Sequence, residues 1–98
     1  MFTSTAHVIT DNGARYVKQL SSHLGRHAQV EEDGGLTSLI FDIDGQAGRC
    51  TLDGSDGSLV LTASADQDAA LAAVETVVAG HLERFGQRDL LSVHWRRD

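Results

Sequence analysis

Histidine is the residue type in this chain with the widest chemical use. The 98 residues include five histidines, and imidazole is both the commonest transition-metal ligand and the side chain that titrates near neutral pH. His23 and His27 stand four apart, the spacing that places two ligands on one face of a helix. Gly25 lies between them, and a left-handed glycine there ends the helix and separates the two rings. The candidate metal ligands are therefore His7, His23, His81 and His94.

A single cysteine and two acidic turns are the other groups that could be reactive. Cys50 falls on the inward side of an alternating segment, where a free cysteine usually behaves as a small hydrophobe. The turns from Asp42 to Gly45 and from Asp53 to Gly57 lack the spacing of an EF-hand, and hairpin turns explain them. No segment has nucleophile-elbow spacing or a phosphate-binding glycine loop. We expect no catalytic residues and no cofactor, with a metal ion as the alternative.

Composition excludes several classes of partner. Eight Lys and Arg against fourteen Asp and Glu give a net charge of −6, which repels nucleic acid. No apolar run approaches the roughly 20 residues of a membrane span, and the first residues lack the basic and apolar regions of a signal peptide. One cysteine forms no internal disulfide. The sequence therefore predicts a cytoplasmic protein that binds neither nucleic acid nor membrane, with residues 1–98 forming a single α+β domain around one core.

The period of the apolar residues changes along the chain and predicts its elements. Spacing of two predicts strands, and spacing of three and four predicts helices. Each predicted helix finishes His-Leu-x-Arg, where cationic groups complement the helix dipole. The predicted elements are a strand from Ser4 to Thr10, a helix capped by Thr10 or Asp11 and ended by Gly25, four short strands between Ala28 and Ala65, a helix capped by Asp66 and ended by Gly86, and a strand from Leu90 to Arg96.

Each predicted helix has one apolar stripe and the predicted sheet has one apolar face. The packing that buries all three is a two-layer sandwich with both helices on one face of the sheet. Its order is strand, helix, four-strand antiparallel meander, helix, strand. The opposite face is then left open, either as solvated surface or as a binding surface. The phase of the alternation places on it Thr5, His7, Thr62, Ser64, Ser92, His94 and Arg96.

Three groups of segments carry a resemblance to a known family. They are Ala14 to Leu20 with His23, Cys50 to Asp53 followed by Gly57 to Leu61, and His81 to Gly86 with Val93 to Trp95. Together they resemble a bacterial family known only as domain of unknown function 2218. The resemblance covers nearly the whole chain and implies a small cytoplasmic α+β domain with no assigned activity or catalytic residues. It also implies a loose link to iron acquisition, because relatives occur near siderophore-interacting reductases.

Three functional hypotheses remain open at this point. The first is a non-enzymatic binding or interaction module that uses the open face or forms a homodimer through it. The second is a metal-binding or iron-siderophore accessory protein, in which some of the histidines contact the metal or a siderophore-related small molecule. The third, a small hydrolase or redox enzyme using Cys50, has the least support because its activating base is not visible in the sequence.

Overall fold

The computed structural model describes residues 1–55 and 57–98. The predicted turn from Asp53 to Gly57 contains Asp56, which lies outside the described residues. No helix in the described ranges is both long and apolar enough to cross a bilayer. The elements are β1 (Phe2–Ile9), α1 (Gly13–Leu24), β2 (Gln29–Asp33), β3 (Leu36–Ile43), β4 (Gln46–Ser55), β5 (Ser58–Ala65), α2 (Asp68–Phe85), the 3-10 helix η1 (Gln87–Asp89) and β6 (Arg96–Arg97).

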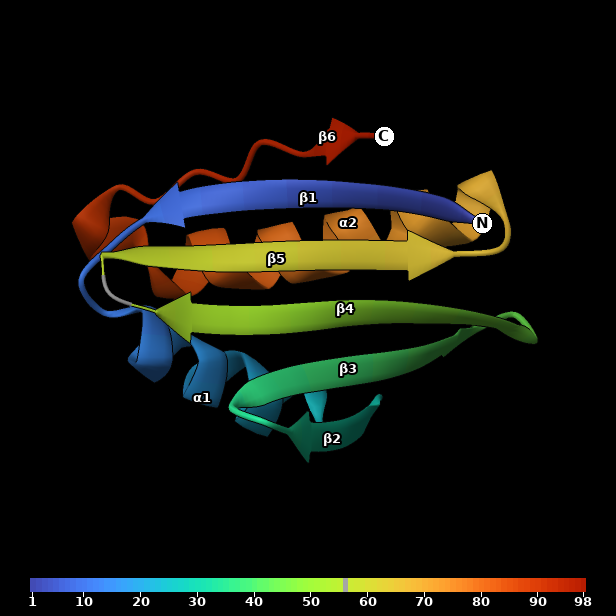
Figure 1. The fold of residues 1–98 in the computed structure, drawn as a ribbon, viewed down its shortest axis with the longest axis horizontal. Coiled ribbons are helices and arrows are strands. Elements are labelled where there is room, and N and C mark those ends of the chain that lie inside the picture. The colour runs from blue at the N-terminus through green and yellow to red at the C-terminus, as the bar shows by residue number, and fades with distance from the viewer. Residues whose placement is uncertain (56) are drawn as a thin grey trace.

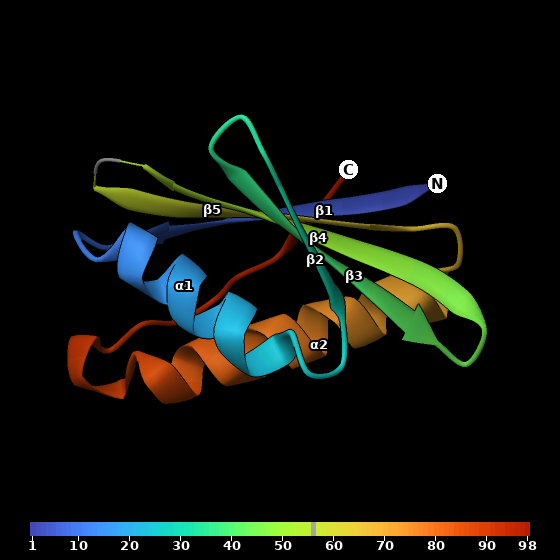
Figure 2. The same ribbon diagram turned by 90° about the horizontal axis from the view of Figure 1, so that it is seen from below.

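The strands form one six-stranded sheet in the order β2-β3-β4-β5-β1-β6. Every neighbouring pair is antiparallel, and β2 to β5 form the predicted meander. The first strand, β1, lies between β5 and the last strand, β6, so both ends of the chain meet at one side of the sheet (Figure 1). Figure 2 shows both helices on the same face of the sheet. The predicted α+β two-layer fold is therefore confirmed.

The strand register aligns the core residues in rows beneath the helices. Leu39, Cys50 and Ala63 are direct neighbours in one row, and all three are fully buried. The next row aligns Leu52 with Leu61 in the same way. Each helix covers these rows with one apolar stripe. The buried stripe residues of α1 and then α2 are Tyr16, Leu20 and Leu24, followed by Leu71, Val74, Val78 and Leu82.

Two glycines of β4 let the helices approach the sheet closely. A β-carbon on Gly48 would lie 2.6 Å from Cγ2 of Val74 in α2. A β-carbon on Gly54 would lie 2.6 Å from the carbonyl carbon of Gly13, the first residue of α1. Real β-carbons do not approach other heavy atoms so closely, because repulsion rises steeply at this distance. Both helices therefore rest on β4 at positions where only glycine fits without rearrangement.

The starts of both helices differ from the prediction. The helix α1 has Asn12 at its N-cap position, and the hydroxyl of Thr10 accepts the Asn12 N–H at 3.1 Å, outside the helix. The helix α2 has Gln67 at its N-cap position, one residue after the predicted cap Asp66. Neither cap residue makes a side-chain hydrogen bond that caps its helix. Residue preference for caps therefore located the helices but misplaced their first turns.

The end of α1 was predicted correctly for the wrong reason. The helix ends at Leu24, but Gly25 has φ −62° and ψ −11°, a right-handed conformation rather than the expected left-handed one. The N–H of His27 donates to the carbonyl of Leu24 at 2.9 Å, which closes a turn instead of continuing the helix. His27 is therefore outside the helix, and it does not share a helix face with His23.

The predicted strand from Leu90 to Arg96 is wrong for most of its length. Only Arg96 and Arg97 pair with β1, opposite Thr5 and Ser4. Leu90 adopts a left-handed conformation, with φ 56°, and residues 91–95 are irregular. Their exposure does alternate as predicted, with Leu91, Val93 and Trp95 partly buried. The alternation arises because one side of this segment packs against the core, whereas the hydrogen-bond partners of the segment belong to a helix.

Helix α2 supplies those hydrogen-bond partners. The N–H of Val93 donates to the Glu83 carboxylate at 2.9 Å, and the indole N–H of Trp95 donates to the carbonyl of Glu75 at 3.2 Å. The Arg97 guanidinium pairs with Asp68 and, at 3.0 Å, with Glu75. These contacts tie the last residues to α2, at the edge of the sheet beside β1 (Figure 1).

Tyr16 of α1 forms a second polar contact with the C-terminal region. Its hydroxyl donates to the carboxylate of Asp89, which also accepts from the Asn12 side chain at 3.4 Å. The hydrogen bond from Tyr16, followed by that from Asn12, lowers the pKa of Asp89. The same bond, together with burial, raises the pKa of Tyr16. This pair joins the first half of α1 to η1.

Replacing Gly54 by Ala should destabilise the fold. The added methyl meets the backbone of Gly13, which cannot rotate away, so we expect a loss of about 1–3 kcal/mol in the free energy of unfolding. Gly80→Ala is the matched control, because a β-carbon at this helical position meets nothing within 4 Å. Gly80→Ala should raise the free energy of unfolding by about 0.5–1 kcal/mol. Urea denaturation measures both, and equal effects of the two substitutions would disprove the close helix contact.

Replacing Tyr16 by Phe should lower thermal stability in a pH-dependent way. The pKa of Asp89 is lower in the folded state, so its bond to Tyr16 stabilises the fold above the unfolded-state pKa, about 3.9, and is lost as pH falls through the folded-state value. The gap in melting temperature between the parent and Tyr16→Phe should therefore shrink on acidification. Asp89→Asn removes the charge. In this background, the difference in melting temperature caused by Tyr16→Phe should no longer depend on pH in the acidic range. An unchanged gap at acidic pH would contradict the assignment.

Candidate functional site

The sheet face opposite the helices is crossed by a row of four hydroxyl side chains with one charged residue at each end. Directly opposed residues of antiparallel strands point to the same side, so the register fixes which side chains share the row. The hydroxyls of Ser38 and Thr51 lie 3.3 Å apart within it. In strand order from β2 to β6, the row consists of Glu31, Ser38, Thr51, Thr62, Thr5 and Arg96.

Charge is divided between the two edges of this open face. The β2 edge carries the exposed carboxylates of Glu31 and Asp33. The β1 and β6 edge carries the exposed side chains of His7 and Arg96. The tip of the β2–β3 hairpin turns away from the helices, so the end of β2 stands above the rest of the face (Figure 2). The Asp98 carboxylate also lies at the β1 and β6 edge, where it accepts the Thr3 hydroxyl at 2.7 Å. The β2 edge is therefore acidic, while the opposite edge carries Arg96 and His7 with one carboxylate beside them.

The open-face candidates fall into two groups. Thr5, His7 and Arg96 lie on the open face, as do Thr62 and Ser64, by the pairing of β1 with β5 and β6. Ser92 and His94 are exposed but lie in the irregular segment before β6. They bond to each other, with Ser92 Oγ 3.0 Å from His94 Nε2. His94 therefore does not belong to the ladder of paired residues that carries His7.

Two of the four candidate histidines meet on the other layer of the molecule. The rings of His23 in α1 and His81 in α2 have centroids 5.3 Å apart. The ring centroid of Phe85 lies 5.2 Å from that of His23 and 6.2 Å from that of His81, so the three rings form one cluster between the helices. Within the described ranges, no group of three or more His, Cys, Asp or Glu side chains is placed to hold a metal ion. The structure thus pairs His23 with His81 and leaves His7 and His94 elsewhere.

Sequence reasoning missed this pairing, although a signal for it was present. Both helices finish with the same His-Leu-x-Arg pattern, in which the leucine, Leu24 or Leu82, is fully or almost fully buried. A histidine directly before a core leucine occupies an equivalent position on each helix. Two helices that pack side by side on one sheet therefore bring the equivalent histidines together.

Cys50 lies in the core between Leu39 and Ala63, as its alternation predicted. Burial raises the pKa of its thiol to about 12, because the thiolate would lose its hydration. The nucleophilic form is therefore almost absent at neutral pH. Its direct neighbours in the row are apolar, so this environment favours a packing role over a catalytic one.

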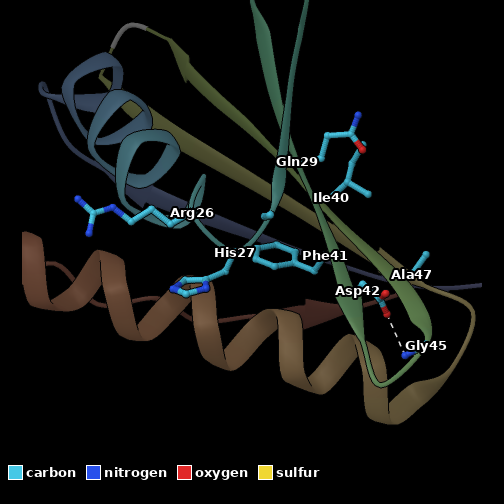
Figure 3. Close-up of a pocket in the computed structure, with 9 residues that line it drawn as sticks. Arg26, His27, Gln29, Ile40, Phe41, Asp42, Gly45 and Ala47 are labelled. Atoms are coloured by element: carbon cyan, nitrogen blue, oxygen red, sulfur yellow. Dashed lines mark hydrogen bonds between the residues drawn. The ribbon is translucent and has the colours of Figure 1, made fainter.

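A pocket of about 560 Å³ opens where β2 separates from β3 (Figure 3). The β2–β3 register begins at Gln29 and Ile40, so β3 continues beyond this point without β2 beside it. His27 and Phe41 lie on one side of β3, and Gln29 and Ile40 lie on the other. The Asp42 carboxylate accepts the Gly45 N–H at 2.8 Å and is used in the hairpin turn. The pocket offers a partly apolar wall with Arg26 and His27 at its rim.

The fold and these surfaces define a class of protein: a two-layer α+β domain with one bare sheet face. The chain belongs to a bacterial family, domain of unknown function 2218, whose profile matches residues 5–96 and whose description is "Uncharacterized protein conserved in bacteria". It is similar to a protein from Pseudomonas aeruginosa, PA4090, whose structure was determined by NMR. The two are 31% identical, the match covers 98% of this chain and 96% of that one, and the TM-score is 0.77. No curated protein matches.

Native Cys50 should resist thiol reagents. With a pKa of about 12 and no exposed surface, it should react with a disulfide reagent at least about a hundredfold more slowly than the same cysteine in the unfolded chain. Because the chain has one cysteine, the absorbance of the released thiolate reports this residue alone. Reaction of the native protein at the unfolded rate would instead indicate an accessible, activated thiol.

Proposed function

We propose that this domain is a non-enzymatic interaction module that pairs with a second copy of itself through the open sheet face. The division of charge across that face is the observation that carries the proposal. One edge presents Glu31 and Asp33, and the other presents His7 and Arg96. A surface with Glu31 at one edge and Arg96 at the other is complementary to a rotated copy of itself at these two positions, as a two-fold dimer interface requires.

The register specifies the rotation. A two-fold axis parallel to the strands, between β4 and β5, places β2 of one copy opposite β6 of the other. Glu31 then faces Arg96 of the second copy in the same row, and the contact occurs twice. The β2–β3 tip projects away from the helices (Figure 2), so in this arrangement it extends towards the β6 edge of the other copy. Opposite charges at both rims also guide the approach of the two copies.

The centre of the face permits close packing. Under the same rotation Thr51 faces Thr62 of the second copy, and these short side chains allow the two sheets to reach the usual separation of about 10 Å. Ile40 and Val60, both partly buried, and the more exposed Leu36 add apolar surface. A hydroxyl centre with few large apolar groups favours a reversible dimer over an obligate one.

Glu31 also has a partner within its own chain. Its carboxylate lies 3.6 Å from the Arg49 guanidinium, and both side chains are about half exposed. A surface pair of this kind contributes little, and a carboxylate accepts several donors, so Arg49 does not prevent a contact with the second copy. The net charge of −6 on each chain opposes association.

The proposed location is the cytoplasm, supported by a lone, buried cysteine that needs no oxidising compartment.

Charge reversal tests this dimer. Glu31→Arg and Arg96→Glu should each weaken self-association, because each places like charges opposite one another in both symmetric contacts. The double variant restores opposite charges and should recover most of the affinity. Sedimentation equilibrium measures all three against the parent protein. Lys18→Glu, on the exposed side of α1, is the control for a change in net charge. It should alter self-association only through the added negative charge on each chain.

Two results would refute the proposal. One is a parent protein that stays monomeric up to its solubility limit. The other is a double variant that associates no better than the single variants, because complementary charges would then have no role in any association observed.

A further inference from the structure

We propose that His23 and His81 form a binding site for a first-row divalent metal ion, Cu²⁺ or Zn²⁺. Each histidine supplies one ring nitrogen, and water or a small chelating molecule fills the remaining positions. The two rings lie on the helix layer, on the opposite side of the sheet from the proposed dimer surface. The site is therefore independent of self-association, and each proposal can fail without the other.

The orientation of His81 is the first support for this site. Its Nδ1 lies 2.8 Å from the carbonyl oxygen of Val77, one turn earlier in α2. When Nδ1–H donates to this carbonyl, the ring is held in the tautomer that has a free lone pair on Nε2. Metal-binding histidines almost always donate their other N–H to a carbonyl, carboxylate or water, which fixes the ring and raises its basicity. Val77 provides that contact here.

The separation of the rings is the second support. A ring centroid lies about 1.1 Å beyond its nitrogen, so two imidazoles bound about 2.1 Å from one ion at a tetrahedral angle have centroids about 5.2 Å apart. The observed centroid separation is 5.3 Å. His23 is exposed, and rotation about its terminal side-chain bond can direct either nitrogen towards the ion.

Phe85 makes the pair more rigid than two surface histidines. Its ring meets His23 nearly edge-on, with an interplanar angle of 79°, and it also contacts His81. Rings held in place before binding lose less conformational entropy when the ion arrives. His81 and Phe85 are both partly buried, while His23 remains open to solvent on its outer side. An ion can therefore reach the pair and keep exchangeable ligands.

The ligand types select the class of metal. Imidazole favours Cu²⁺, Zn²⁺ and Ni²⁺. Along the first-row divalent metals, the affinity of a given site increases up to Cu²⁺ and is lower for Zn²⁺. Mg²⁺ and Ca²⁺ prefer oxygen ligands. Among the described residues no third protein ligand joins the pair, so the affinity is that of two imidazoles and the ion stays exchangeable. Such an ion can accept donor atoms from a small chelating molecule.

Titration with Cu²⁺, Zn²⁺ and Mg²⁺ tests the site in the intact protein. Calorimetry should show saturable binding of one ion per chain, tighter for Cu²⁺ than for Zn²⁺ and absent for Mg²⁺. The NMR ring signals of His23 and His81 should shift together on addition of Zn²⁺, while those of His7, His27 and His94 respond less. His23→Phe and His81→Phe keep an aromatic ring in the cluster but remove a ligand, so each should weaken binding by about tenfold or more.

His27→Phe is the matched control, because His27 is exposed and lies outside the ring cluster. It should leave the affinity unchanged. If either Phe variant melts earlier than the parent protein, His23→Ala replaces it, since an exposed side chain can be shortened at little cost to the fold. Three results would overturn the proposal: no saturable binding, equal shifts of all the histidines, or the same loss of affinity in His27→Phe as in His23→Phe.

Discussion

The close contacts of α1 and α2 with one strand determine which face of the sheet is covered. Val74 occupies the space where a side chain of Gly48 would be, and the start of α1 lies against the backbone of Gly54. Gly48 and Gly54 are an even number of residues apart in β4, so both contacts are on the same face. Both helices are thereby placed in one layer, where His23 can reach His81. The same packing leaves the hydroxyl row and its charged edges uncovered.

The sequence contained the inward and outward phase of the strands, but it did not contain their partners. Period-two alternation correctly placed Leu39, Cys50 and Leu61 in the core. The same alternation from Leu91 to Trp95 was interpreted as a strand, although this segment bonds to α2. Alternation follows from one side of a segment being buried, and a segment lying along a helix satisfies that condition as well as a strand does. Cap residues likewise predicted that a helix begins near Asp66 without fixing its first turn.

The sites depended on strand order and helix packing, which local patterns do not specify. The basic edge of the open face exists because β1 is inserted between β5 and β6, so that Arg96 aligns with Thr5. The position of Glu31 in the same row depends on four successive registers across the sheet. His23 and His81 are distant in sequence and meet only because both helices pack on β4. The residue types were visible in the sequence, whereas their convergence required the fold.

The opposite positions of the two proposed sites have a consequence for the assembly. Pairing through the sheet faces leaves the helix layers on the outside, so a dimer presents its two histidine pairs on opposite surfaces. The two ions are then separated by two sheets and two helix layers, which excludes a shared binuclear centre of the kind that needs metals about 3.5–4 Å apart. Because β4 already holds both helices, the histidine pair is formed before an ion arrives, and binding need not be coupled to folding. The arrangement therefore favours two independent, exchangeable sites, each able to deliver or receive an ion at its own surface.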